Sequence, residues 1–226
     1  MIGDSPLALE AIDLVASHGG APVLDGVSLA VGAGEAVFIA GSNGAGRSTL
    51  VGALAGLVPS RGVVAVLGRA VPRNRPAAAV RAGLVAVPER RQLFPGMTVE
   101  ENLVLGAYTG GAWTVRAARR APALEDVYAL FPALRGRRSQ TAGTLSGGEQ
   151  QMLALGRALV SDPAVLLLDE PFLGLAPAVS DALVETLAAL RDGGRALVVV
   201  DDHPRRIASL ADRVVTFERG RVVTPA

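Results

Sequence analysis

The sequence predicts an α/β protein with a mixed parallel core sheet, a small antiparallel β layer and an inserted helical subdomain. Three observations lead to this fold class. Continuous apolar runs at 36–40, 165–168 and 196–200 are typical of buried parallel strands. The first 70 residues are rich in short strands separated by glycines, and a helical pattern occupies about 98–138. The 226 residues suffice for a single domain, 1–226. We expect its core at about 1–88 and 160–226 and its helical subdomain at about 89–159.

Composition excludes several classes of protein. There are 22 basic and 21 acidic residues, a net charge of +1, so no basic field favours nucleic acid as a partner. The chain has no cysteine, which excludes disulfides and thiol chemistry. No apolar run is long enough to span a membrane, and the first residues lack the pattern of an export signal. We therefore expect a cytosolic protein that does not bind nucleic acid.

The first third of the chain alternates short strands with turns. Residues 7–14 alternate in the manner of a strand, and 23–31 form a second extended stretch that ends in glycines. Residues 62–68 form another short strand between two glycines. Together they predict a small antiparallel layer beside the site described next.

A glycine-rich loop, Gly41–Thr49, lies between an apolar strand at 36–40 and a helical stretch at 50–57. Its spacing is Gly41, four residues, Gly46, a cation and Ser48, which is typical of a phosphate-binding loop. Glycines let successive backbone N–H groups point at phosphate oxygens, and the helix adds its positive end. Ser48 is placed to bind magnesium. The alternative is a glycine-rich β-to-α turn without a ligand.

The cation of this loop is Arg47, where the phosphate-loop pattern has lysine. The chain contains no lysine at all, so all 22 basic residues are arginine. The arginine at position 47 is therefore partly explained by the preference of the whole chain for arginine over lysine.

The middle of the chain is predicted to be helical. A strand at 84–89 is ended by proline, and Thr98 with Glu101 then forms a capping box that begins a helix. We interpret the basic cluster 116–120 as a solvated helix face. Four further apolar residues share one helical face: Val127, Leu130, Phe131 and Leu134.

A second motif, the signature segment Leu145–Gln151, precedes a helix predicted over Met152–Val160. It reads Leu-Ser-Gly-Gly-Glu-Gln-Gln. A serine and two glycines at a helix N-terminus expose N–H groups at a positive dipole end, which predicts a second phosphate-binding site. The alternative is an ordinary capped helix start.

A third motif follows the apolar run 165–168. Two carboxylates, Asp169 and Glu170, stand at its C-terminal end, where ligands bind in parallel sheets. One carboxylate can hold magnesium, directly or through water, and the next can act as general base on a water molecule. The alternative is a solvated acidic turn.

Two more strands are predicted at 196–200 and 213–217, with Asp201–Pro204 and a helix over 205–210 between them.

These three motifs, in this order, resemble the ATP-binding cassette (ABC) family of P-loop NTPases, and the resemblance covers 7–223. Four further segments resemble the shorter ATP-binding subunit of branched-chain amino-acid uptake systems. They are VPERR at 87–91, FPGMTVEENL at 94–103, LGAY at 105–108 and LGLAP at 173–177.

The resemblance assigns roles residue by residue. In the chain's own site it implies that the nucleotide contacts His18, Gly41, Ser42, Asn43, Gly44, Ala45, Gly46, Arg47, Ser48 and Thr49. For the nucleotide of a second cassette it implies contacts from Ser146, Gly147, Gly148 and Glu149. It implies catalytic positions at Glu170, Asp202, His203 and Glu89, and magnesium ligation at Ser48, Asp169 and Glu89. Gly174 and its neighbours are the expected D-loop.

The resemblance also implies an activity and partners. The expected activity is an ATPase that couples the binding and hydrolysis of ATP, with Mg²⁺, to solute import. The expected solutes are branched-chain or other small hydrophobic amino acids. Expected partners are a second ABC ATP-binding subunit in a head-to-tail heterodimer, two membrane permeases and, indirectly, an extracytoplasmic solute-binding protein. The expected location is cytoplasmic, peripheral on the inner face of the plasma membrane.

Four residues depart from the family pattern around the chain's own site. Arg47 replaces lysine, and His18 replaces an aromatic residue that stacks on adenine. Phe172 replaces a small or polar residue of the D-loop. Asp202 occupies the position where the family has its switch histidine, and His203 follows one place later. These departures leave open an alternative function, a nucleotide-binding, poorly hydrolytic structural half of a heterodimeric ABC transporter. A third reading, a soluble cassette of translation or DNA repair, lacks the paired cassettes or long coiled-coil insertion typical of that class.

Overall fold

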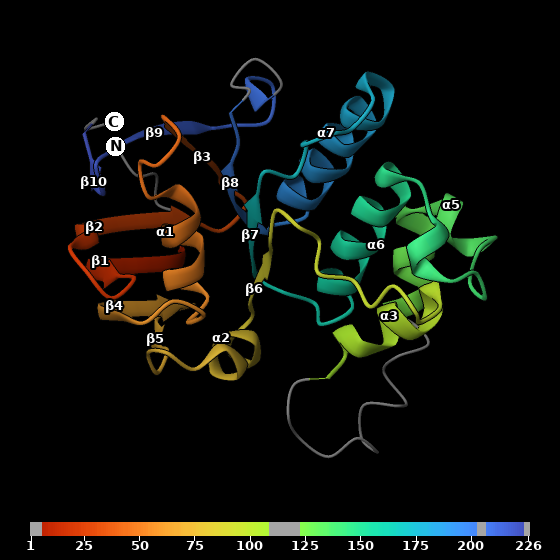
Figure 1. Cartoon of the computed structure of the whole chain (residues 1–226), viewed down its shortest axis with the longest axis horizontal. Coiled ribbons are helices and arrows are strands. Elements are labelled where there is room, and N and C mark those ends of the chain that lie inside the picture. Colours follow the sequence, from red (N-terminus) through yellow and green to blue (C-terminus); the bar gives the residue numbers. More distant parts are fainter. Residues whose placement is uncertain (1–5, 109–122, 203–206, 224–226) are drawn as a thin grey trace.

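A computed structural model describes residues 6–108, 123–202 and 207–223 of the chain. Two β-sheets and two groups of helices make up these parts. Figure 1 shows the smaller sheet with α1 at one end of the molecule and the helices α3, α5 and α6 at the other. The strands β3, β7 and β8 lie between them, so the α/β fold class is confirmed.

The main sheet has six strands in the order β10-β9-β3-β8-β7-β6. Every pair is parallel except β10 with β9, so the sheet is mixed, as predicted. Its strands, in chain order, are β3 (Ala36–Gly41), β6 (Leu84–Val87), β7 (Val165–Asp169), β8 (Ala196–Val200), β9 (Arg213–Glu218) and β10 (Arg221–Val222).

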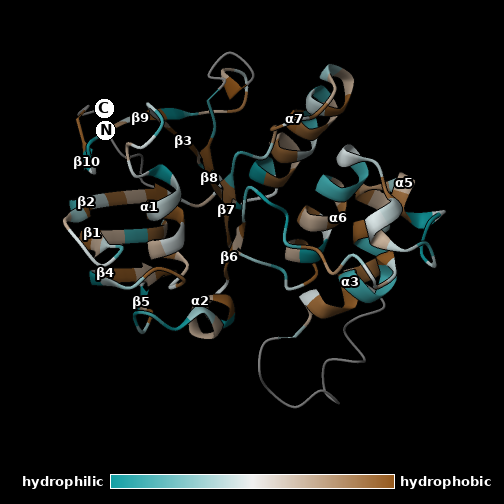
Figure 2. Cartoon of the chain, in the orientation of Figure 1, coloured by the Kyte–Doolittle hydropathy of each residue, from teal (hydrophilic) through white to brown (hydrophobic). Residues whose placement is uncertain are grey.

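The central strands are buried on both faces, which explains their continuous apolar sequences. In β7, Val165 and Leu167 pack into one hydrophobic core, and Leu166 and Leu168 pack into another. The same alternation holds for β8. The sheet thus divides the interior into two cores, and Figure 2 shows the apolar residues concentrated along these strands.

The first core lies between the main sheet and a four-stranded antiparallel sheet of order β2-β1-β4-β5. This second sheet is the antiparallel layer expected from the glycine-punctuated start of the chain. Its strands are β1 (Leu7–Ser17), β2 (Pro22–Gly32), β4 (Ser60–Val66) and β5 (Arg69–Ala70). The helices of this side are α1 (Arg47–Leu54) and α2 (Pro76–Ala82), and α1 contributes Leu50 and Leu54 to the same core.

The second core holds the remaining helices. They are α3 (Val99–Gly106), a helical segment at 123–130, α5 (Pro132–Arg135), the short 3₁₀ helix η1 (Ala142–Thr144), α6 (Gly147–Leu159) and α7 (Pro177–Asp192). The predicted capping box of Thr98 and Glu101 is present at α3. Val127, Phe131 and Leu134 are buried, and Leu130 is partly buried, as their shared face indicates.

Some expectations differ from the structure or fall outside it. α6 begins at Gly147, five residues before the predicted Met152. The basic cluster 116–120 and part of the predicted helix at 205–210 lie outside the described residues. Among the residues the structure describes, no helix has the length and apolar character needed to cross a membrane.

Candidate functional site

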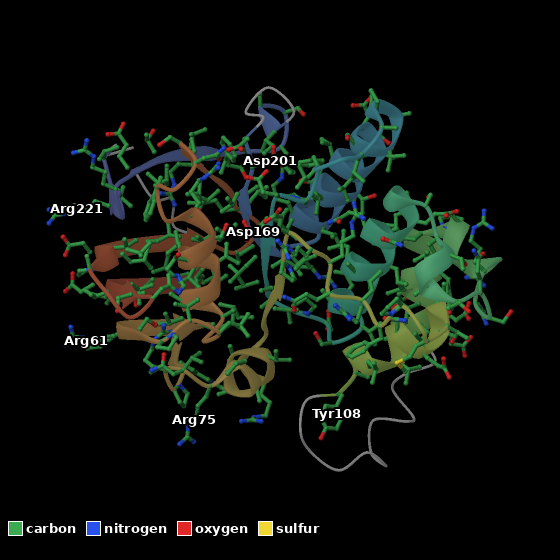
Figure 3. All side chains as sticks on the ribbon, in the orientation of Figure 1. Arg61, Arg75, Tyr108, Asp169, Asp201 and Arg221 are labelled. Carbon is green, nitrogen blue, oxygen red and sulfur yellow. The ribbon has the colours of Figure 1, made fainter. Side chains whose placement is uncertain are left out.

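The predicted site residues converge on one edge of the main sheet. β3, β6, β7 and β8 run parallel, so their C-terminal ends share this edge. The glycine-rich loop follows β3, the carboxylates Asp169 and Glu170 stand at the end of β7, and Asp201 and Asp202 follow β8. Figure 3 shows Asp169 and Asp201 in the middle of the molecule, whereas Arg61, Arg75 and Arg221 lie at its outer edge.

The geometry of the glycine-rich loop requires glycine at two positions. Gly46 caps the N-terminus of α1 with φ 103°, in the left-handed region that L side chains avoid. A Cβ at Gly41 would overlap the carbonyl oxygen of Phe217 in the neighbouring strand β9. Within the loop, the Ala45 N–H donates to the Ser42 carbonyl over 3.0 Å, which closes a tight turn. The backbone of the loop is thus compatible with the predicted phosphate cradle.

Ser48 and Asp169 place two oxygens side by side. The Ser48 hydroxyl donates to Asp169 Oδ1 over 3.1 Å. Two adjacent ligands of octahedral Mg²⁺, each at about 2.1 Å, lie about 3 Å apart, so this pair fits the expected magnesium ligands. Burial raises the pKa of Asp169; the Ser48 hydrogen bond opposes the rise, the charge of Glu89 adds to it and Arg47 opposes it. A bound cation would offset the cost of this buried carboxylate.

Glu89, the third expected magnesium ligand, is exposed two residues after β6 ends. Among the residues with described structure, no three carboxylate or imidazole side chains are grouped as a metal site.

Glu170 lies close to the end of β8. Its carboxylate accepts a hydrogen bond of 3.3 Å from the Asp202 N–H, and its side chain is only 14% exposed. Burial raises the pKa of Glu170 to about 7, and the charges of Asp201 and Asp202 add to the rise while Arg47 opposes it. A carboxylate with a pKa near the operating pH suits a general base. Its backbone adopts φ 49°, a strained conformation often found at functional sites.

Arg47 lies at the centre of these groups and is 7% exposed. Its guanidinium donates to the Asp201 carbonyl over 3.0 Å and to Asn43 Oδ1 over 3.2 Å. It also forms ion pairs with Asp202 and, at 3.5 Å, with Glu170. Sequence reasoning treated Arg47 and Asp202 as separate departures from the family pattern, and the structure brings them into direct contact.

His18 lies beside the glycine-rich loop, with its Nε2 3.2 Å from the Thr49 hydroxyl. Both side chains are at least partly exposed, as an adenine platform beside the loop requires. His203 lies outside the described residues. Phe172 is 1% exposed and belongs to the second core, so its apolar side chain serves packing.

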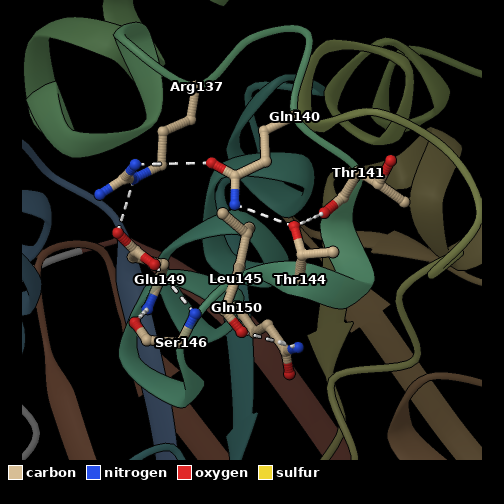
Figure 4. A network of polar contacts seen from close by, with 8 residues as sticks. All are labelled: Arg137, Gln140, Thr141, Thr144, Leu145, Ser146, Glu149 and Gln150. Carbon is tan, nitrogen blue, oxygen red and sulfur yellow. Dashed lines mark hydrogen bonds and ion pairs between the residues drawn. The ribbon is translucent and has the colours of Figure 1, made fainter.

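The signature segment is held by local hydrogen bonds, drawn in Figure 4. Ser146 caps α6 by accepting from the Glu149 N–H over 3.3 Å, and Glu149 accepts from the Ser146 N–H over 2.9 Å. Arg137 donates to Glu149 over 2.7 Å, and Gln150 donates to the Leu145 carbonyl over 3.2 Å. The Ser146 backbone N–H is the main cause of the lowered pKa of Glu149, with its hydroxyl and Arg137 as further causes.

The two glycines of the signature segment differ in their surroundings. A Cβ at Gly147 would have only the Arg91 guanidinium near it, at 3.7 Å, whereas one at Gly148 would collide with Val179 at 2.8 Å. Gly147 therefore has open space beside it, and Gly148 is required by packing against α7. Figure 1 shows that α6 and α1 lie on opposite sides of the main sheet.

Sequence reasoning missed Arg91. Its guanidinium donates to Gln151 over 3.0 Å and to Gln150 over 3.2 Å on α6, and it contacts the Leu173 carbonyl at 3.5 Å. It thereby links the loop after β6 to the signature helix and to the loop after β7. These partners lie about 60 and 82 residues away in sequence, so no local pattern indicates them.

Comparison with known proteins places these observations in a family. A family model described as ABC transporter matches residues 24–173. The high-affinity branched-chain amino acid transport ATP-binding protein BraG of Pseudomonas aeruginosa is 41% identical over 91% of this chain and 87% of its own length. The Nod factor export ATP-binding protein I of Rhizobium meliloti is 34% identical over 96% of this chain, which spans 63% of that relative.

Solved structures agree on the fold. A nucleotide-free ATP-binding cassette from an ABC transporter superimposes with a TM-score of 0.84 at 24% identity, over 96% of this chain and 90% of that one. A structure described as the ATP-binding subunit of an ABC transporter gives a TM-score of 0.82 at 29% identity, over 96% of this chain and 88% of that one.

Proposed function

Since the chain belongs to the ABC transporter family of ATP-binding proteins, which are ATPases, we propose that it couples ATP binding and hydrolysis to the import of branched-chain or other small hydrophobic amino acids. The observation that carries this proposal is the convergence of Ser48, Asp169 and Glu170 beside the glycine-rich loop. These groups supply a phosphate cradle, two magnesium ligands and a general base at a single sheet edge.

The chain's own residues suit each step of hydrolysis. The backbone of Gly41–Thr49 and the positive end of α1 bind the phosphates. Ser48 and Asp169 would hold Mg²⁺, which neutralises charge on the phosphate oxygens as it develops. Glu170 takes a proton from the attacking water, and its raised pKa of about 7 strengthens its basicity relative to an ordinary carboxylate.

The arrangement of the chain favours a second cassette as partner. The signature segment offers N–H groups at a helix start and open space at Gly147, yet its helix α6 lies on the other side of the main sheet from α1, the helix that follows the glycine-rich loop. Phosphate bound by these N–H groups would therefore belong to the nucleotide of another subunit, in a head-to-tail heterodimer. ABC ATP-binding subunits work with membrane permeases, so we place this chain at the inner face of the plasma membrane.

The choice of solute and direction rests on the relatives. BraG, by its name, serves branched-chain amino acid transport and matches most of this chain. The Nod factor relatives, by their names, serve export, and this chain spans a smaller share of their length. The segments at 87–91, 94–103, 105–108 and 173–177 also favour the branched-chain amino-acid branch.

Transport by the intact complex tests this proposal. A tag on this chain would recover the complex from native membranes for reconstitution in liposomes with its solute-binding protein. Radiolabelled leucine should move toward the side that holds the cassette and ATP, and radiolabelled glucose should not. Movement of solute away from the cassette, or ATP-dependent transport with no preference for leucine, would contradict the proposal.

A further inference from the structure

Two departures from the family pattern contact each other in this fold. Arg47 begins α1, and Asp202 follows β8, 155 residues later. Their side chains form an ion pair and hydrogen bond, with Arg47 7% exposed and Asp202 40% exposed. The ion pair is therefore partly buried: its arginine lies inside the protein, and its carboxylate is partly exposed to solvent.

Several protein acceptors surround the guanidinium of Arg47. Its acceptors are the Asp201 carbonyl, Asn43 Oδ1 and the carboxylate of Asp202, with Glu170 3.5 Å away. A guanidinium is always charged and binds carboxylate and phosphate through the same planar fork. Asp202 and a nucleotide phosphate are consequently alternative partners for the same donors.

We propose that Asp202 is an internal anion that holds Arg47 in the nucleotide-free chain and that the phosphates of ATP displace it. This inference rests on the proposed nucleotide binding and adds a step to it: Arg47 exchanges one anionic partner for another. The exchange opposes ATP binding by the free energy of the pair. It also explains how Asp202 is accommodated beside Asp169 and Glu170, because Arg47 offsets its charge before nucleotide arrives.

A lysine at position 47 would not be held in the same manner. Its ammonium is a compact charge with three rotatable donors, whereas arginine presents a fixed fork that several acceptors can occupy at once. Arg47 and Asp202 should therefore be energetically coupled, and substitutions at the two positions should be tested together.

A double-mutant cycle on the purified full-length chain measures this coupling. The four proteins are the parent, Asp202→Asn, Arg47→Gln and the double variant, each titrated with a non-hydrolysable ATP analogue and Mg²⁺. Asp202→Asn should tighten binding about two- to fivefold when Arg47 is present, the range expected for a partly exposed ion pair. It should leave affinity unchanged in the Arg47→Gln background.

Thermal unfolding without nucleotide supplies a second readout. Asp202→Asn should lower the melting temperature of the parent but not of Arg47→Gln, because only the parent loses an ion pair. Should Arg47→Gln fail to fold, Arg47→Lys replaces it and should reduce both effects. Asp162→Asn is the matched control, because Asp162 also forms an ion pair with an arginine, Arg195, at the opposite edge of the sheet. This substitution should change neither the affinity for the ATP analogue nor the coupling between Arg47 and Asp202.

Two results would overturn the inference. Weaker binding by Asp202→Asn would mean that Asp202 aims Arg47 at the phosphate. Equal tightening in both backgrounds would mean that Asp202 only repels phosphate and exchanges no partner. A parent chain that binds no nucleotide would instead contradict the proposed function, so the two failures are distinguishable.

Discussion

At the scale of single residues, the sequence pointed to the carboxylates of the candidate site but not to the neighbours that shift their pKa values. Asp169 and Glu170 were recognisable because two carboxylates end a wholly apolar strand. Their pKa values depend on burial and on Arg47, Asp201 and Glu89, which lie far away in sequence. The contact of Arg47 with Asp202 was unpredictable for the same reason, since it forms only when β3 and β8 pair.

Asp169 gives a prediction that separates a functional from a structural carboxylate. Asp169→Asn keeps the side-chain oxygen that accepts from Ser48 and removes a buried charge. Without nucleotide, the free energy of unfolding of this variant should therefore lie within about 1 kcal/mol of the parent's, or exceed it. Mg²⁺ should no longer strengthen ATP binding. Thermal unfolding with and without ATP, each with and without Mg²⁺, checks both statements. A large loss of stability with an intact Mg²⁺ effect would assign Asp169 a structural role.

At the scale of elements, short-range sequence patterns predicted the start of a helix where a few adjacent residues determine it. The capping box at Thr98 was read correctly because its two partners are three residues apart. The start of α6 was misplaced by five residues because two glycines there disfavour helix in isolation. The capping box of Ser146 with Glu149 and the packing of Gly148 against α7 outweigh that preference.

The capping box of α6 predicts a pH-dependent contribution to stability. Glu149→Gln keeps an oxygen for the Ser146 N–H but removes the charge near the helix N-terminus and the ion pair with Arg137, so it should cost about 0.3–1 kcal/mol at pH 7. The pKa of Glu149 is lowered in the folded chain, so the charged form stabilises the fold above the unfolded pKa of about 4.3. This stabilisation is lost as the pH falls through the lower folded pKa.

Thermal unfolding of the parent and Glu149→Gln between pH 7 and pH 3 measures this effect. The difference in melting temperature should shrink toward zero at the acid end. Glu185→Gln, an exposed change in the middle of α7, is the matched control and should show little difference at any pH. A deficit of Glu149→Gln that persists unchanged at pH 3 would rule out the charge as its cause.

At the scale of the whole molecule, the architecture was predictable because it depends on periodicity. Continuous apolar runs indicated strands buried on both faces, and glycine-separated strands indicated the antiparallel layer; the structure confirms both. The packing of α6 and α7 on the face opposite α1 was not indicated by any local pattern. We expect only from the family resemblance that the glycine-rich loop and the signature segment contact different nucleotides.

We propose that this chain's own site hydrolyses ATP through Glu170. The most direct measurement is ATP turnover by the intact complex in which the partner cassette is disabled by substitution of its own general base. With this partner, Glu170→Gln should lower turnover about a hundredfold or more while ATP binding persists. Equal turnover with Glu170 and with Gln at this position would show that the site contributes no hydrolysis, and the chain would then be the structural half of its transporter.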